Sequence, residues 1–130
     1  MKKGFTLIEL LVVITIIATL IGVASVSYIR ATKSARDARR KTDLEQIRQA
    51  LESYRSQIGT YPPTGSLGSL SPSYITILPP DPKAGYLYPY TRLTTTTYAL
   101  CATQESSAAS APANCGSCGS ANCRYKVTQP

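Results

Sequence analysis

Residues 10–29 read LLVVITIIATLIGVASVSYI, a run of twenty positions without a charged side chain. Glu9 precedes this run and Arg30 follows it. A helix needs about 20 apolar residues to cross the hydrocarbon core of a bilayer. The run therefore predicts a transmembrane helix, and it limits what the rest of the 130-residue chain can build.

The residues outside this run are polar and rich in Tyr, Ser and Thr. The whole chain has one Phe, one Met and no Trp, so we expect only a small hydrophobic core outside the run. The chain has no His, which excludes Ser-His-Asp and Cys-His nucleophile pairs and His-containing zinc sites within it. We therefore expect no enzymatic activity, no cofactor and no metal site.

Basic residues gather directly after the apolar run. The chain has 14 Lys and Arg residues against 7 Asp and Glu residues. A basic cluster next to a membrane span is typical of contact with anionic lipid headgroups or nucleic acid. The alternative, which we favour, is a solvated helical neck. The cluster comprises Arg30, Lys33, Arg36, Arg39, Arg40 and Lys41.

The N-terminus does not have the order of a secretory signal peptide. Such a peptide places a small-residue cleavage site after its apolar run, so that the run is discarded. Here Lys2, Lys3 and Gly4 come before the run, and no small-residue signal follows it. Cleavage at Gly4 would retain the apolar helix in the mature protein.

The stretch from Lys2 to Ile14 reads KKGFTLIELLVVI and resembles the processing motif of type IV prepilins and type II secretion pseudopilins. The resemblance implies that residues 1–4 are a leader, and that a membrane aspartyl peptidase cuts after Gly4 and methylates the new amine of Phe5. It also implies a pilus assembly platform and minor pilins as partners, with membrane lipid around the helix before assembly.

Glu9 is a carboxylate at the edge of an apolar helix, where an unpaired charge carried to the bilayer centre costs about 2.5–3.5 kcal/mol. It can lie at the level of the headgroups. The resemblance implies a second role, in which Glu9 pairs with the Phe5 amine of an adjacent subunit in a filament core. Thr6 and Glu9 are the assembly residues that the resemblance assigns.

The resemblance implies a structural subunit of a type IV pilus, a homopolymer used for adhesion, motility or surface attachment. The alternative is a pseudopilin of a type II secretion or DNA-uptake system. A nucleic-acid-binding module built on the basic cluster is less favoured, because packed helices would bury those side chains. We expect a single-pass cytoplasmic membrane precursor with an exported head, and a cell-surface or extracellular filament after assembly.

The sequence remains compatible with a helix from about Thr6 to Ile58, with residues 5–29 as the filament-core part and residues 30–58 as an amphipathic neck and head part. Residues 30–43 lack an apolar stripe, so we expect them to be bare in the monomer or contacted only by neighbouring subunits. Gly59 predicts a left-handed helix stop. The apolar stripe on one helix face consists of Leu44, Ile47, Leu51, Tyr54 and Ile58.

The composition of residues 59–130 predicts a loop rich in Pro, Ser and Thr. A β-sheet head that is cross-linked by disulfides should follow this loop. We expect a turn of helix near Leu67–Leu70 and an antiparallel sheet covering the helix stripe. Pro89 limits the first strand to an edge. The fold class is α+β, a pilin lollipop with a three-stranded sheet. The expected strands are Tyr86–Tyr90, Thr94–Cys101 and Arg124–Thr128.

The segment around Asp81 and Pro82 resembles a loop that leads into a calcium-holding region in major pseudopilins. Calcium binds six to eight oxygens, usually from several carboxylates. After residue 60 the chain has only Asp81 and Glu105. We therefore do not expect calcium to bind there.

Four cysteines lie in the last thirty residues, and we favour structural disulfides over a zinc site or a thioredoxin-like redox site. Cys101 ends the second expected strand and Cys123 comes just before the third. We expect the pair Cys101–Cys123, with Cys115–Cys118 inside the loop. A different hairpin register would give Cys101–Cys115 and Cys118–Cys123.

Overall fold

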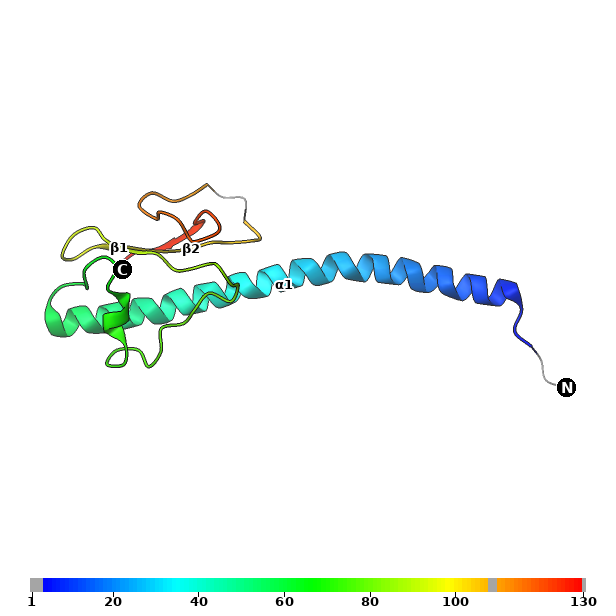
Figure 1. Cartoon of the computed structure of the whole chain (residues 1–130), viewed down its shortest axis with the longest axis horizontal. Coiled ribbons are helices and arrows are strands. Elements are labelled where there is room, and N and C mark those ends of the chain that lie inside the picture. Colours follow the sequence, from blue (N-terminus) through cyan, green and yellow to red (C-terminus); the bar gives the residue numbers. More distant parts are fainter. Residues whose placement is uncertain (1–3, 108–109, 130) are drawn as a thin grey trace. The chain divides into compact units, whose positions relative to one another are not determined.

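The computed structural model describes residues 4–107 and 110–129. The predicted α+β class is confirmed, and the elements follow the chain in the order labelled in Figure 1. Two compact units divide the chain, an N-terminal unit that ends at Lys33 and a head unit that begins at Ser34. The leader lysines Lys2 and Lys3 lie outside the described residues. The elements are α1 (Leu7–Ile58), η1 (Leu67–Leu70), β1 (Tyr90–Arg92), β2 (Tyr98–Ala102) and β3 (Tyr125–Val127).

Helix α1 exposes its apolar side chains throughout the N-terminal unit, for example Leu7 and Leu20. By length and composition it can cross a membrane, as the apolar run predicts. The hydroxyls of Thr15 and Thr19 donate to the carbonyls of Val12 and Ile16, both at 2.8 Å. These polar groups are therefore satisfied within the helix, as an apolar environment requires.

In the head unit, α1 buries most of the predicted stripe. Leu44, Ile47 and Leu51 have no exposed surface, and Tyr54 packs against them while partly buried. The prediction is wrong for Ile58, which is 57% exposed. Ile58 is the last residue of the helix, and Gly59 follows with φ of +85°, so the chain turns away before this side chain can be covered.

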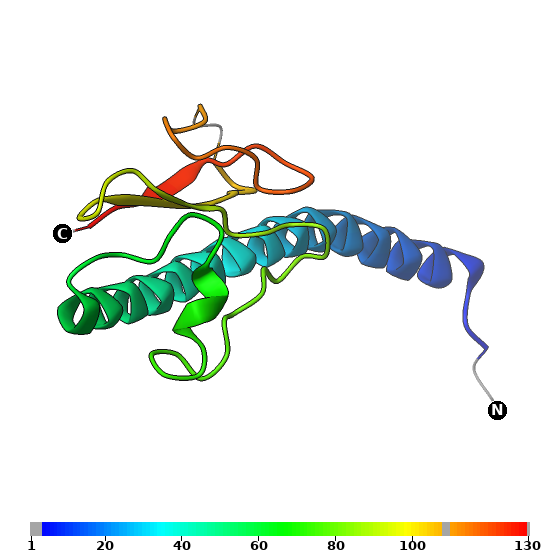
Figure 2. The same ribbon diagram turned by 60° about the vertical axis from the view of Figure 1, so that its left-hand side comes forward.

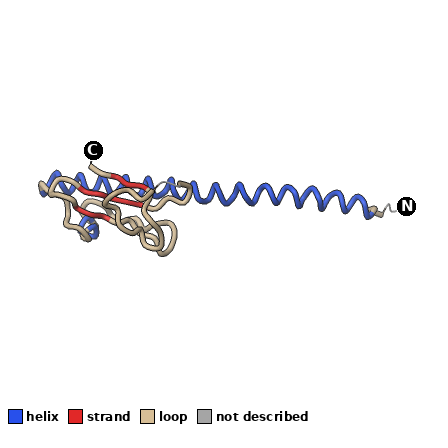
Figure 3. Tube along the Cα trace, turned by 90° about the horizontal axis from the view of Figure 1, so that it is seen from above, coloured by secondary structure: helices blue, strands red, loops and turns tan. Residues whose placement is uncertain are grey.

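The three strands form an antiparallel sheet in the order β1-β2-β3, with β2 in the centre and buried along its whole length. Tyr90 lies opposite Leu100, and Leu100 lies opposite Val127. Figure 3 shows the strands alongside the C-terminal part of α1 within the head unit. The sheet thus covers the helix stripe, as the pattern predicts.

The strands are shorter than the sequence predicts. The first begins only after Pro89, which has no N–H to donate to a ladder, and Tyr86 forms just an isolated bridge with Gly119. The second loses its first residues to a tight turn, in which Leu93 N donates to Thr97 O at 2.9 Å. The Thr94 and Thr97 hydroxyls bond to each other there at 2.7 Å, so local hydrogen bonds replace strand pairing.

The two faces of β2 contact different clusters. Tyr98, Leu100 and Ala102 join the cluster that contains the helix stripe, Tyr61 and Leu70. Ala99 and Cys101 face the other way, into a cluster with the remaining three cysteines. Figures 1 and 2 show η1 and the loop after it on the side of α1 away from the sheet. The one-turn helix predicted at Leu67–Leu70 is confirmed.

The disulfides join Cys101 to Cys115 and Cys118 to Cys123. The expected pair Cys101–Cys123 is therefore wrong, and the alternative pairing is the one observed. The strand register gives the reason, since Cys101 lies opposite Lys126 and not opposite Cys123. Cys123 falls beyond the end of the ladder, where it meets Cys118 instead.

Candidate functional site

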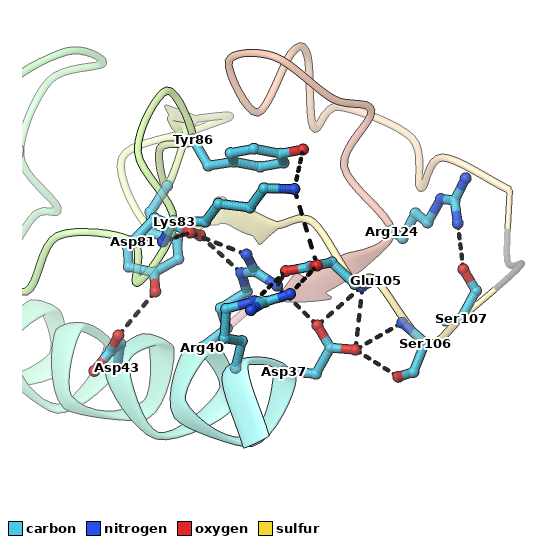
Figure 4. A network of polar contacts seen from close by, with 12 residues as sticks. Asp37, Arg40, Asp43, Asp81, Lys83, Tyr86, Glu105, Ser106, Ser107 and Arg124 are labelled. Carbon is cyan, nitrogen blue, oxygen red and sulfur yellow. Dashed lines mark hydrogen bonds and ion pairs between the residues drawn. The ribbon is translucent and has the colours of Figure 1, made fainter. Parts of the chain in front are cut away.

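A cluster of charged side chains joins three segments of the head unit around Arg40 (Figure 4). Nε and Nη2 of Arg40 donate to the two carboxylate oxygens of Asp81, at 2.8 and 3.0 Å. Its Nη1 contacts Asp37 at 2.8 Å and Glu105 at 3.0 Å. The Arg40 side chain is only 1% exposed, so three carboxylates surround one buried guanidinium.

The outer members of the cluster balance its charge. Glu105 also pairs with Arg36, and it lies 3.9 Å from Lys83 Nζ. Asp37 accepts hydrogen bonds from the Glu105 and Ser106 amides, both at 2.9 Å, and from the Ser106 hydroxyl. The cluster thus contains three carboxylates and three cationic side chains, and their pairing offsets part of the free energy lost when the charges are removed from water.

The pKa values follow from this geometry. Hydrogen bonds from Arg36 lower the pKa of Glu105 to about 2, against the opposing effect of burial and with the help of Arg40. Burial opposes the charge of Arg40, but its bonds to Asp81 and Glu105 raise its pKa above the ordinary value. Glu105 and Arg40 therefore both stay charged at neutral pH.

The cluster corrects the expectation that residues 30–43 are bare. Asp37, Arg40 and Asp43 are buried, and Arg36 is ion-paired. The spacing of residues along the chain does not indicate this pairing, because Arg36 and Glu105 are 69 positions apart. Arg30, Lys33, Arg39 and Lys41 are exposed, as a solvated neck predicts. The basic stretch therefore divides into exposed residues and two arginines held inside the head.

The other carboxylates of the head unit also form hydrogen bonds or ion pairs. Asp43 accepts from the Tyr88 hydroxyl at 2.8 Å, and Glu52 accepts from the Tyr61 hydroxyl at 2.7 Å. Glu45 pairs with Arg48. Residues 34–129 contain six acidic and ten basic side chains, and all six acids have such partners. The head therefore keeps an excess of cations that no described carboxylate neutralises.

Three of these cations lie in or next to the edge strand β3. The ammonium group of Lys41 lies 5.7 Å from the centre of the Tyr125 ring. Arg124 and Lys126 flank Tyr125 along the chain, and Lys126 lies opposite Cys101 on the other face of the sheet from the Tyr125 ring. A guanidinium nitrogen of Arg124 donates to the Ser107 carbonyl. We call Lys41, Arg124 and Lys126 the β3 cations. Sequence reasoning missed Arg124 and Lys126, although their positions on either side of Tyr125 were visible.

The predicted processing and assembly residues lie at the start of the N-terminal unit. Gly4, Phe5 and Thr6 are exposed and precede the helix, and no heavy atom lies within 4 Å of where a Gly4 Cβ would be. Glu9 is in the first turn of α1 and accepts hydrogen bonds from Thr6. Among the described residues, no group of three or more Asp, Glu or Cys side chains is arranged to hold a metal ion.

Two family models match the chain. Residues 1–25 match the prokaryotic N-terminal methylation motif, and residues 26–121 match the family described as type IV minor pilin ComP, DNA uptake sequence receptor. No curated protein and no solved structure matches the chain. These families consist of structural subunits, and a long apolar N-terminal helix suits a membrane-anchored precursor.

The second match covers well over half of the sequence, and the fold is the α+β fold that a pilin predicts. The expected resemblance to type IV pilins is therefore confirmed. The chain is a type IV pilin and belongs to the family of the type IV minor pilin ComP.

Proposed function

We propose that this chain is a minor pilin of a type IV pilus that takes up DNA, and that its head binds duplex DNA at the β3 cations. The observation that carries the proposal is the charge distribution of the head. All six of its carboxylates have hydrogen-bond or ion-pair partners within the head, while Lys41 lies beside the Tyr125 ring of the edge strand β3 and Arg124 and Lys126 are the neighbours of Tyr125 in the chain. The description of the matched family as a DNA uptake sequence receptor supports the same ligand.

Cations of this kind bind the DNA backbone. Each Lys or Arg that neutralises a phosphate releases condensed counterions, so affinity falls steeply as salt rises. Arg36 and Arg40 do not contribute, because their guanidinium groups already bind carboxylates. The DNA-binding cations are therefore those near the edge strand of the sheet, and not the whole helical basic cluster that the sequence indicates.

The N-terminal unit anchors this head. We propose that a prepilin peptidase removes residues 1–4, that the helix lies in lipid before assembly, and that the assembly platform transfers it into a pilus with other pilins. The exposed apolar side chains from Leu7 to Ile29 support this, because a filament core would cover them. The finer roles in adhesion, motility or surface attachment, and the type II secretion alternative, stay predictions.

DNA binding is tested with the full-length protein in nonionic detergent micelles and a short fluorescein-labelled DNA duplex. Anisotropy titrations at several salt concentrations give both the affinity and its salt dependence. Lys126→Gln and Lys41→Gln should each weaken binding and reduce the slope of log affinity against log salt by about 1. Arg124→Gln should do the same.

Arg48→Gln is the matched control, because Arg48 is a helical cation that already pairs with Glu45. It should leave the affinity and the slope close to those of the parent protein. If the triple variant of the β3 cations bound the duplex as tightly as the parent, with an unchanged slope, DNA binding at this edge would be excluded.

A further inference from the structure

A hollow of about 470 Å³ lies in the head unit, between α1 and the loop that follows η1. Its helix wall consists of Gln46, Gln49, Ala50 and Ser53, whose spacings of three and four place them on one face of α1. Residues 72–76 form the opposite wall. Figures 1 and 2 show this loop on the side of α1 away from the sheet, so the hollow is separate from the β3 cations.

The loop wall is held in place by the rest of the head. The Tyr74 amide donates to the carbonyl of Leu70, a residue of the buried core, at 2.8 Å. The Tyr74 hydroxyl donates to Gln57 of α1 at 2.9 Å, and the Tyr74 ring meets the Tyr54 ring edge to face, with their centres 5.2 Å apart. The loop is therefore fixed against the helix before a ligand arrives, which lowers the entropy lost on binding.

The lining of the hollow is polar but carries no charge. None of the residues that line it is acidic or basic. A charged ligand would therefore lose hydration there without gaining an opposite charge. Hydroxyl and amide side chains can each donate and accept hydrogen bonds. Four of those in the lining bond to no other described residue: the side chains of Gln46, Ser53, Ser73 and Thr76.

We propose that this hollow binds a neutral saccharide. The hydroxyls of a sugar ring can exchange hydrogen bonds with the free amide and hydroxyl side chains, while its C–H face packs against Tyr74 and Ile75. The volume of about 470 Å³ lies within the range of about 300–1,000 Å³ that is usual for ligand pockets. The site is independent of the proposed DNA binding, and it would let a surface filament attach to glycans.

A peptide fits these walls less well. An extended peptide binds mainly by adding to a sheet edge, where its backbone pairs with unpaired backbone groups, and a proline-rich peptide binds in an aromatic groove. The helix wall here is made of side chains, since the backbone of α1 is already hydrogen-bonded within the helix. Side-chain hydroxyls and amides match a polyol better than they match a peptide backbone.

Saturation-transfer difference NMR of the full-length protein tests the proposal. The protein is held in polyoxyethylene detergent, because the headgroups of maltoside and glucoside detergents are themselves sugars and would compete. The neutral probes are glucose, galactose, mannose, N-acetylglucosamine and N-acetylgalactosamine, and the charged probes are glucuronic acid and N-acetylneuraminic acid. We expect saturation transfer to at least one neutral sugar and much less to either acid.

Variants locate the binding. Gln46→Ala and Ser53→Ala each remove one hydrogen-bonding group at an exposed position, so the affinity for the neutral sugar should fall by about three- to tenfold. Ser53→Tyr fills the hollow and should abolish the signal. Ser34→Ala is the matched control, because Ser34 is an exposed helical serine outside the hollow, and it should bind the sugar like the parent. Thermal melts followed by circular dichroism check that each variant is folded.

Three results would overturn the proposal. The first is the absence of saturation transfer to every neutral sugar. The second is equal binding of the acids and the neutral sugars, which would contradict the role of the uncharged lining. The third is unchanged sugar binding by folded Gln46→Ala, Ser53→Ala and Ser53→Tyr, which would place the sugar elsewhere on the protein.

Discussion

Arg40 and Asp81 lie 41 positions apart in sequence and form a two-point ion pair, with Nε and Nη2 of the guanidinium at 2.8 and 3.0 Å from the two carboxylate oxygens. Their side chains are 1% and 0% exposed. This pair fixes the loop around residue 81 to α1, and the same guanidinium holds Glu105. The stability of the head therefore depends on a buried group that belongs to the basic stretch after the membrane helix.

Arg40→Met should destabilise the head by about 3–5 kcal/mol, because it leaves the buried carboxylates of Asp37 and Asp81 without their cation. Urea unfolding of the full-length protein in micelles, followed by the near-ultraviolet circular dichroism of its tyrosines, measures this change. Arg39→Met on the exposed neighbouring position is the control and should change stability by less than about 0.5 kcal/mol. Equal effects of the two variants would contradict the importance of the cluster.

Acid should weaken the head through Glu105. Its pKa is about 2 in the folded head against an ordinary 4.5, so the unfolded chain binds the proton more readily. The stabilisation is complete above pH 4.5 and is lost as the pH falls toward 2. Unfolding midpoints measured across this range should fall with pH. Glu105→Gln should be less stable at pH 7 and should show a flatter pH dependence; an unchanged acid slope would argue against this role.

Tyr98→Phe should stabilise the head by about 1 kcal/mol. The Tyr98 hydroxyl is buried and has no hydrogen-bond partner among the described residues, and burial raises its pKa. Removing an unsatisfied buried hydroxyl removes its desolvation penalty. Tyr90→Phe is the matched comparison, because the Tyr90 hydroxyl donates to the Pro62 carbonyl at 2.7 Å. That variant should lose about 1 kcal/mol, and effects of the same sign in thermal melts would contradict the distinction.

Disulfide mapping should find Cys101 joined to Cys115 and Cys118 joined to Cys123. Partial reduction, alkylation with two labels and fragment sequencing assign the pairs. Replacing Cys101 and Cys115 by Ala should cost about 3 kcal/mol, and replacing Cys118 and Cys123 about 2 kcal/mol, because the first pair closes the longer loop, with a separation of 14 against 5. A peptide linking Cys101 to Cys123 would show that the head has another register.

Processing should occur between Gly4 and Phe5. The glycine is exposed and precedes the helix, so a peptidase can reach the bond. Mass spectrometry of the mature protein should find an N-terminal methylated Phe5 and the loss of Lys2 and Lys3, which lowers the formal charge from +7 to +5. Gly4→Leu should leave the precursor in the membrane fraction. An intact Met1 in sheared pili would contradict this prediction.

Features that depend on residues close together in the chain could be predicted from the sequence alone. The uncharged run of residues 10–29 and the absence of Gly and Pro between Ala31 and Ile58 predict the long helix, and Gly59 predicts its end. The spacing of Leu44, Ile47 and Leu51 identified the face that the sheet covers. These signals are local in the chain, since helix periodicity and turn chemistry act over a few residues.

Contacts between groups that are distant in sequence could be identified only in the folded head. The register places Lys126 opposite Cys101, three residues beyond Cys123, and so it excludes the Cys101–Cys123 pair that a different register would have favoured. Folding placed Asp81 and Glu105 around Arg40 and so removed two arginines from the exposed basic stretch. It also brought Lys41 to the strand that carries Arg124 and Lys126. Charge pairs and disulfides depend on distances in space, and the spacing of residues along a single sequence does not specify those distances.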